Sequence, residues 1–317
     1  MKKTSQKILF FGNERLATGV GSTAPTFRAL LASGYEIAAL ISSYTQARSR
    51  RNREPEIHEV ARQHNIPIIS PKRMSDIHDD IKKMDAVIGV LVAFGKIVPQ
   101  STIDLFPRGI INLHPSLLPE HRGSTPIESV ILRGENKTGV SIMRLEAKMD
   151  AGPIYGQKTV QLKGSETKQH LADRLLQLGS EMIIEVLPDI LSGKLEPKIQ
   201  DESASSYDQP IQKQDGVIDW TNSAEAIERQ IRAFHEWPQS KAVLNGLEVI
   251  ITKGHAIDKQ PKDQLPGSIT LATEAPYITI ATGTGLISIE SLKPLGKNIM
   301  PAQAFLAGYK DKLAKKA

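Results

Sequence analysis

The chain has 317 residues with 40 Lys and Arg against 35 Asp and Glu, so its formal net charge of +5 is mild. It contains no cysteine, which excludes disulfides, a thiolate nucleophile and a cysteine-ligated zinc centre. The apolar run near the N-terminus, Ile8–Phe11, is too short for a signal peptide, and no stretch approaches the about 20 apolar residues of a membrane span. We therefore expect a cytoplasmic protein that has no membrane partner.

Strand-like and helix-like segments alternate through the first two-thirds of the chain. Strands are predicted at Lys7–Phe11, Glu36–Ile41, Pro67–Ile69, Asp85–Leu91 and Gly109–His114, followed by two edge strands at Gly139–Leu145 and Ile154–Leu162. Helices are predicted at Ala24–Ala32, Glu56–His64, Ile77–Lys83, Pro126–Arg133 and Thr167–Leu191. Continuous apolar strands between helices indicate an α/β fold, a Rossmann-like and mostly parallel sheet that is covered on both faces.

The composition changes after residue 191. Residues 192–214 are polar and include a Ser-rich patch, which is typical of a linker. One helix, Ala224–Phe234, is followed by short β-rich segments at Ala242–Leu244, Glu248–Lys253, Gly267–Ala272, Tyr277–Ala281 and Leu286–Leu292. We predict a catalytic α/β domain over residues 1–191, a linker over 192–214 and a small OB-like barrel domain over 215–317.

Polar side chains follow two of the apolar runs in the first domain. Asn112 and His114 are two residues apart at the end of a predicted strand, so both side chains face the same way. Open α/β sheets bind their ligands at this edge. Asp150 comes after a second apolar stretch. An amide can stabilise negative charge on a carbonyl oxygen, an imidazole can move a proton, and a carboxylate can orient the imidazole. The three residues are candidates for catalysis at a carbonyl group.

Other interpretations of these residues are less favourable. Each of the three could make only local hydrogen bonds at a strand end. A metal site formed by His114, His121 and Asp150 is possible in donor type, but Pro119 between the histidines excludes a continuous helix, so we expect no metal. Ser116 lacks the Gly-x-Ser-x-Gly context of a hydrolase nucleophile.

An apolar loop lies directly beside the candidate centre. Leu117, Leu118 and Pro119 could pack under the sheet edge, or they could form one wall for a flat heterocycle. The end of the neighbouring strand, Val90–Phe94, could form the facing wall.

A cluster of arginines follows the second predicted strand and comprises Arg48, Arg50, Arg51 and Arg53. Such a cluster can be a solvated loop, or it can contact phosphate groups, which guanidinium groups bind with two hydrogen bonds.

The motifs together resemble those of the folate-dependent formyltransferases. They are Asn112-x-His114, Ser116-Leu117-Leu118-Pro119, Arg122-Gly123, Thr138-Gly139-Val140 and Asp150-x-Gly152. Within that superfamily the chain is similar to the branch that acts on methionyl-tRNA, because the likeness extends beyond the first domain. It includes Gln200-Asp201-Glu202-Ser203, Ile218-Asp219-Trp220 and the segment from Arg229 to Pro238.

This resemblance implies a specific reaction. The formyl group of 10-formyltetrahydrofolate, the co-substrate, would pass to the amino group of methionine on initiator tRNA. Asn112, His114 and Asp150 match the family's catalytic residues. Ser116, Leu117, Leu118 and Pro119 match its folate-contacting loop, with Val90, Leu91, Val92 and Phe94 opposite. Arg48, Arg50, Arg51 and Arg53 occupy the place of the family's basic tRNA-binding insertion. The partners would be the tRNA and the folate, and we expect a monomer.

Three rival functions remain open at this point. A formyltransferase acting on an amino sugar nucleotide shares the core and has a similar extension. An RNA-binding protein on the same scaffold would show steep salt dependence without formyl transfer. A hydrolase would release formate from the folate without any amine acceptor.

Overall fold

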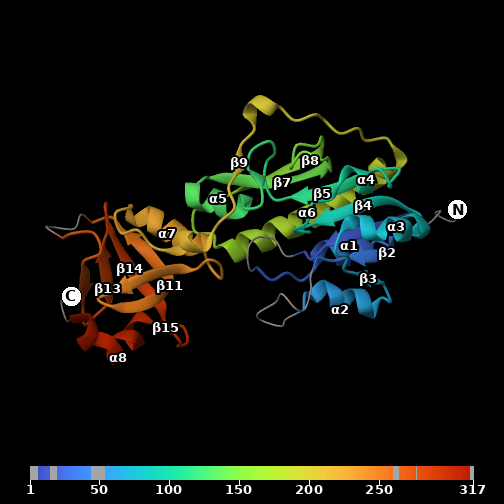
Figure 1. Ribbon diagram of the computed structural model, residues 1–317. Coiled ribbons are helices and arrows are strands. Elements are labelled where there is room, and N and C mark those ends of the chain that lie inside the picture. The colour runs from blue at the N-terminus through green and yellow to red at the C-terminus, as the bar shows by residue number, and fades with distance from the viewer. Residues whose placement is uncertain (1–5, 15–19, 44–53, 260–263, 276, 315–317) are drawn as a thin grey trace. The chain divides into compact units, whose positions relative to one another are not determined.

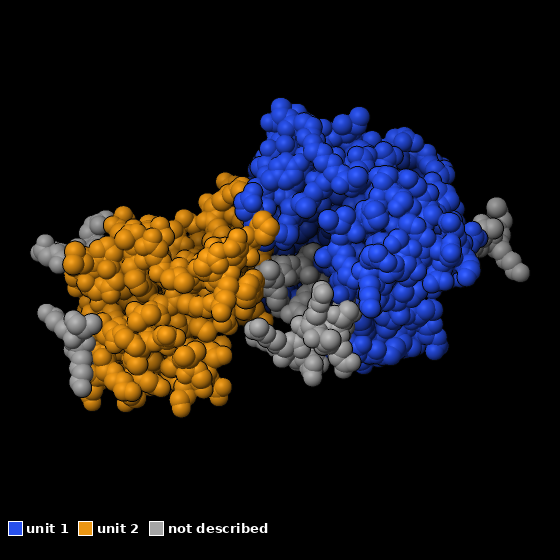
Figure 2. Space-filling view, in the orientation of Figure 1, with its two compact units in different colours: residues 1–127, 137–162, 169–209 blue, residues 128–136, 163–168, 210–317 orange. Residues whose placement is uncertain are grey.

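The computed structural model describes residues 6–14, 20–43, 54–259, 264–275 and 277–314. The chain divides into two compact units, coloured separately in Figure 2. Unit 1 comprises residues 1–127, 137–162 and 169–209, and unit 2 comprises residues 128–136, 163–168 and 210–317.

Unit 1 is built on a seven-stranded sheet (Figure 1). Its strands are β1 (Lys7–Gly12), β2 (Glu36–Ile41), β3 (Ile68–Ile69), β4 (Ala86–Val92), β5 (Ile110–His114), β7 (Lys137–Arg144) and β8 (Ile154–Gln161), in the order β3-β2-β1-β4-β5-β7-β8. The five strands from β3 to β5 are parallel, and β7 and β8 add on as antiparallel strands. The predicted mostly parallel sheet is therefore confirmed. The second of the two late strands, β8, lies at the edge, whereas β7 lies inside between β5 and β8.

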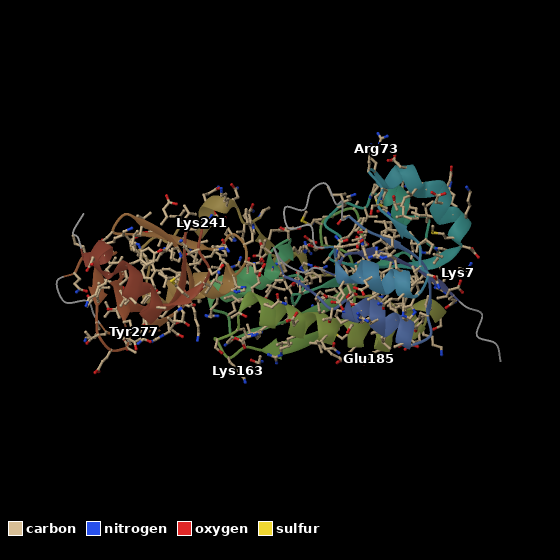
Figure 3. The ribbon with its side chains drawn as sticks, turned by 90° about the horizontal axis from the view of Figure 1, so that it is seen from below. Lys7, Arg73, Lys163, Glu185, Lys241 and Tyr277 are labelled. Carbon is tan, nitrogen blue, oxygen red and sulfur yellow. The ribbon has the colours of Figure 1, made fainter. Side chains whose placement is uncertain are left out.

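The helices that follow these strands in the chain are α1 (Pro25–Ala32), α2 (Glu56–Gln63), α3 (His78–Met84), α4 (Gln100–Ile103), α5 (Pro126–Arg133) and α6 (Lys168–Ser192). Most of α5 belongs to unit 2. The longest, α6, packs closely on the sheet. A methyl group added at Gly179 would lie 2.4 Å from the Leu113 side chain of β5. Charged side chains such as Arg73 and Glu185 project from the periphery of the unit (Figure 3). Among the described residues, no helix has both the length and the apolar character needed to cross a membrane.

Glu14 satisfies the N-terminus of α1. The residue before that helix, Ala24, offers no side-chain cap, and the fully buried Glu14 carboxyl group instead accepts from the backbone N–H groups of Phe27 (2.7 Å) and Thr26 (3.2 Å). Burial raises the pKa of Glu14 to about 8, against the opposing effect of the hydrogen bonds from Phe27 and Thr26. Glu14 therefore anchors the start of α1.

This burial predicts a pH effect on stability. The unfolded chain loses the Glu14 proton near pH 4.5, whereas the folded chain holds it to about pH 8, so folding stability falls as pH rises across that range. A Glu14→Gln variant lacks this titration. The melting temperature of the wild type should therefore fall relative to that of the variant between about pH 5 and about pH 8. Calorimetry across that range checks it, and a constant difference would contradict the assignment.

Unit 2 is dominated by a bent antiparallel sheet (Figure 1). Its elements are α7 (Ala224–Ala233), β10 (Ser240–Leu244), β11 (Leu247–Ile257), β12 (Ile269–Leu271), β13 (Ile278–Ala281), β14 (Leu286–Pro294), β15 (Met300–Pro301) and α8 (Ala302–Ala314). The strand order is β10-β11-β14-β13-β12, and β15 pairs with β14. Its core joins the strands to α7 through Ile227 and Ile231 and to α8 through Phe305. The predicted β-rich second domain is confirmed, and α8 adds a helix that the sequence pattern did not indicate.

The polar segment that follows α6 forms ordered structure in unit 1 as far as residue 209. Its backbone at Lys198 pairs with Ile154 in both directions, at 2.7 and 2.8 Å. Further along, β9 (Tyr207–Asp208) pairs in parallel with β6 (Arg122–Gly123). Parts of this segment are therefore paired with the backbone of unit 1, although its polar composition is typical of a linker.

Candidate active site

Asn112 and His114 lie on one face of β5 near its carboxyl end. Leu113 between them packs against Gly179 of α6, so the flanking side chains face the opposite side of the sheet. Both are nearly buried, with 7% and 5% of their surface exposed. The antiparallel partner β7 places Met143 opposite Asn112 and Ser141 opposite His114. The predicted pair is thus held on a rigid strand.

The Asn112 side chain has no hydrogen-bond partner within the described ranges. Its amide is not among the fully buried atoms that lack a partner, so part of the amide surface is accessible. The amide retains a small exposed area, so a ligand atom can reach it. An amide donor in this state is available for a ligand oxygen.

The His114 ring is oriented by two groups. Its Nε2 lies 2.9 Å from the carbonyl oxygen of His121. Because a carbonyl oxygen only accepts, Nε2 carries the hydrogen of this bond. The other ring nitrogen, Nδ1, lies 3.8 Å from Oδ1 of Asp150. Nδ1 is therefore the nitrogen that faces the carboxylate and can exchange a proton.

Asp150 reaches this position on a tightly constrained loop. Its φ angle is +49°, a left-handed conformation that costs a non-glycine residue energy. The backbone N–H of Gly123 donates to its Oδ2 at 2.8 Å, which leaves Oδ1 directed at His114. A side chain at Gly152 is excluded because a Cβ there would lie 1.9 Å from the Arg144 carbonyl oxygen. The structure therefore brings all three predicted catalytic residues together.

The predicted folate-contacting residues line the same region of the sheet. On β4, Leu91 pairs with Asn112 and Val92 with Leu113, while Val90, Val92 and Phe94 are at most 1% exposed. The loop Ser116–Pro119 is held from behind: Ser141 Oγ donates to the Ser116 carbonyl oxygen and accepts from the Leu118 N–H. Their side chains are mostly buried, so contact with a ligand would involve backbone groups and the exposed edges.

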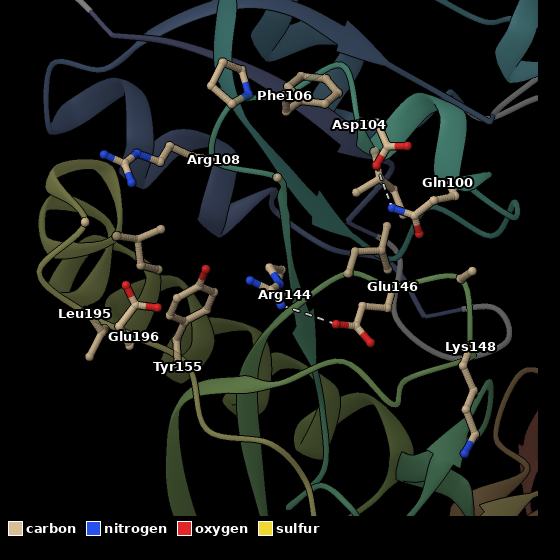
Figure 4. Close-up of a pocket in the computed structure, with 17 residues that line it drawn as sticks. Gln100, Asp104, Phe106, Arg108, Arg144, Glu146, Lys148, Tyr155, Leu195 and Glu196 are labelled. Atoms are coloured by element: carbon tan, nitrogen blue, oxygen red, sulfur yellow. Dashed lines mark hydrogen bonds and ion pairs between the residues drawn. The ribbon is translucent and has the colours of Figure 1, made fainter.

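A cavity of about 870 Å³ lies near the start of β5 (Figure 4). It is bordered by Ile103 and Phe106 and by charged and aromatic groups at Arg108, Arg144 and Tyr155. The loop Leu145–Lys148, which leads to Asp150, forms another wall. None of the predicted folate-contacting residues lines this cavity. The sequence reasoning did not single out its lining residues.

The arginine cluster, Arg48, Arg50, Arg51 and Arg53, lies outside the described residues. The structure therefore gives no geometry for the predicted tRNA contact. For metal binding, the described part of the chain holds no group of three His, Asp or Glu side chains at suitable spacing. His121 instead has Nδ1 2.9 Å from Asp208 Oδ2.

Two family profiles match the chain. One, described as formyl transferase, matches residues 17–187, and one, described as the formyl transferase C-terminal domain, matches residues 210–310. Methionyl-tRNA formyltransferase of Methylococcus capsulatus is 34% identical over 310 residues, covering 96% of this chain and 97% of that protein. The enzyme of the same name from Coxiella burnetii is 34% identical over 98% of this chain and 97% of its own.

The chain belongs to the methionyl-tRNA formyltransferase family.

Solved structures agree with the fold of this formyltransferase family. HypX from Aquifex aeolicus in complex with tetrahydrofolic acid superposes with a TM-score of 0.66 at 16% identity, covering 96% of this chain and 47% of that one. The N-formyltransferase from Helicobacter canadensis, in complex with folinic acid and dTDP-3-aminofucose, gives 0.65 at 18% identity over 90% and 98% of the two chains.

Several residues that shape the site were outside the sequence-based prediction of roles. In this family member the His121 carbonyl orients His114, the Gly123 N–H holds Asp150, and Gln200 contacts the Asp150 backbone. Arg122-Gly123 and Gln200 appeared in the motifs of the resemblance, but backbone contacts leave no pattern in local sequence. The one available signal was that Arg122, Gly123 and Gln200 belong to the same set of motifs as Asn112, His114 and Asp150.

Proposed function

We propose that this protein transfers the formyl group of 10-formyltetrahydrofolate to the amino group of methionine on initiator tRNA. The observation that carries the proposal is the unpaired amide of Asn112, set on the same strand face as a His114 ring that faces Asp150. The near-full-length likeness to methionyl-tRNA formyltransferases supports this acceptor over a sugar amine.

The chemistry assigns one task to each residue. As the amine nitrogen bonds to the formyl carbon, negative charge develops on the formyl oxygen, and the Asn112 amide donates to it. His114 Nδ1 takes the proton that the attacking amine gives up, and Asp150 stabilises the imidazolium that forms. As the bond from the formyl carbon to the folate nitrogen breaks, that proton returns to the leaving nitrogen. The products are formyl-methionyl-tRNA and tetrahydrofolate.

The co-substrate is proposed to lie along the edge shared by β4 and β5. Val90, Leu91, Val92 and Phe94 would form one wall and the loop Ser116, Leu117, Leu118 and Pro119 the other. Support comes from the register that sets Leu91 beside Asn112 and from the bonds that fix the Leu118 backbone. Fixed backbone groups suit recognition of a flat heterocycle that has several hydrogen-bonding atoms.

The acceptor is tested by incubating the purified protein with 10-formyltetrahydrofolate and methionyl initiator tRNA. Formation of formyl-methionyl-tRNA, with no transfer to methionyl elongator tRNA, supports the proposal. Transfer only to an amino sugar nucleotide would replace the acceptor and keep the chemistry. Release of formate without any amine would replace transfer with hydrolysis.

The arginine cluster is proposed to contact tRNA phosphates. Replacing Arg48, Arg50, Arg51 and Arg53 with alanine should weaken tRNA binding and flatten its salt dependence, because each lost phosphate contact removes about 0.7–0.9 from the log–log slope. A matched control removes four exposed cations elsewhere in unit 1, at Lys72, Arg73, Lys82 and Lys83. Binding titrations at several salt concentrations check it, and equal slopes in both variants would contradict the proposal.

A further inference from the structure

The segment after α6 returns to the catalytic residues. We name residues 198–208 the strap. Its first part is paired with Ile154, and its last part, β9, is paired with β6. Both attachments lie in unit 1, beside the loops that carry Asp150 and His121. The strap therefore runs between the two groups that orient His114.

Gln200, at the start of the strap, holds the backbone of the Asp150 loop. Its Nε2 donates to the carbonyl oxygens of Asp150 at 2.8 Å and Gly152 at 2.6 Å. The side chain is nearly buried, with 6% of the residue exposed, so water cannot readily replace these bonds. The two bonds, one before and one after residue 151, restrain the loop at the point where the backbone of Asp150 is left-handed.

Arg122 fixes the other end of the Gln200 amide. Its Nε and Nη2 both donate to Gln200 Oε1, at 3.2 and 2.8 Å, so the amide can take only one orientation. The guanidinium, which is fully buried, also donates to Glu202 (2.9 Å) and to the Tyr207 hydroxyl (2.9 Å). Hydrogen bonds from Arg122 and Lys148 lower the pKa of Glu202 to about 2, so Glu202 stays ionised at neutral pH.

The far end of the strap holds the carbonyl group that orients His114. Ser206 Oγ accepts from the His121 N–H at 2.9 Å, and the Ser206 carbonyl oxygen accepts from the Arg122 N–H at 2.9 Å. Asp208 lies 2.9 Å from His121 Nδ1. One short segment thus contacts the supports of both His114 and Asp150.

We propose that Gln200 is a positioning residue that acts through Asp150: its two bonds to the loop backbone keep the Asp150 carboxylate directed at His114. The strap as a whole sets the spacing of the His114–Asp150 pair. This inference rests on the proposed function, in which that pair carries the proton.

Gln200→Glu is the most informative variant. The replacement has the same shape and keeps an oxygen for Arg122, but a carboxylate cannot donate to the two loop carbonyls. Removing Arg122 instead would leave buried partners unpaired and could prevent folding. Gln169→Glu is the matched control, because Gln169 Nε2 also donates to a backbone carbonyl, that of Gly21 at 3.1 Å, far in sequence from the site.

Two measurements test the proposal. In formyl transfer, Gln200→Glu should lower kcat by about 10- to 100-fold with little change in either KM, since small displacements of catalytic groups act on the chemical step. Single-turnover assays in an Asp150→Asn background should show almost none of this loss, because effects that pass through one residue are not additive. In the protein without substrates, hydrogen exchange of the backbone around residues 148–152 should be faster in Gln200→Glu than in Gln169→Glu.

A failure of the inference about Gln200 can be distinguished from a failure of the proposed function. If the wild type does not formylate methionyl-tRNA, the acceptor is wrong, and the exchange measurement still tests the strap. Unchanged exchange around residues 148–152 overturns the inference. So does an equal loss of kcat in the Asp150→Asn background, which would mean that Gln200 acts on the fold as a whole.

Discussion

Replacing His114 with alanine should lower kcat by about 10²- to 10⁴-fold, the range that positioned proton transfer contributes. The ring's Nδ1 is the nitrogen that faces Asp150, and its Nε2 is tied to the His121 carbonyl group. No other ring is placed to take over among the described contacts of Asp150, whose side chain meets only His114 and the Gly123 N–H. Steady-state formylation of methionyl-tRNA measures the loss.

The control for His114 is His64→Ala, an exposed histidine at the end of α2. It should retain wild-type kcat, and both variants should melt close to the wild type. Added imidazole should restore part of the turnover of His114→Ala if the missing group is a proton carrier. Near-wild-type kcat in His114→Ala would remove this residue from the mechanism.

Replacing Asn112 with alanine should lower kcat by about 10²- to 10³-fold, equivalent to about 2.7–4 kcal/mol of transition-state stabilisation. The physical reason is that the Asn112 amide makes no hydrogen bond with the described residues and is held on a buried strand. No hydrogen bond within the protein has to break before the amide donates to the developing charge. The same formylation assay measures the change.

The Asn112→Asp variant tests whether hydrogen-bond donation by the amide, and not only the shape of the side chain, is needed for turnover. A carboxylate has the same outline but repels a developing oxyanion, so this variant should lose at least as much turnover as Asn112→Ala. Asn136→Ala, at an exposed position, is the control and should behave as the wild type. If Asn112→Asp retained most of its activity, the amide would have only a structural role.

The central strands of unit 1 were predictable because a buried parallel strand is a run of apolar residues. The strand predicted at Asp85–Leu91 is observed as Ala86–Val92, displaced by one residue because Asp85 is left-handed at the end of α3. Helix α8 was missed although its buried side chains, Ala302, Phe305, Leu306 and Leu313, recur at helical spacing. Ala304, Ala307 and Gly308 are exposed, and these small residues weaken the contrast between the apolar face and the solvent face.

The placement of the candidate catalytic residues Asn112 and His114 was predictable from strand geometry, whereas the groups that hold the site together were not. Alternation along one strand was enough to place Asn112 and His114 on one face. Gln200, by contrast, is 50 positions from Asp150 and 78 from Arg122, and it lies in a segment whose polar composition indicated a linker. A polar composition indicates that a segment is exposed to solvent on average. The polar side chain of Gln200 is instead buried, because it forms hydrogen bonds with residues distant in the sequence.

The accessible amide of Asn112 has a consequence for the choice of ligand. It makes no hydrogen bond with the described residues, so a ligand oxygen that binds there breaks no bond within the protein. Affinity for a carbonyl ligand is therefore gained without disturbing the fold, and a ligand that has no acceptor atom at this position forgoes that gain. The same side chain thus contributes to binding and to the selection of a carbonyl group.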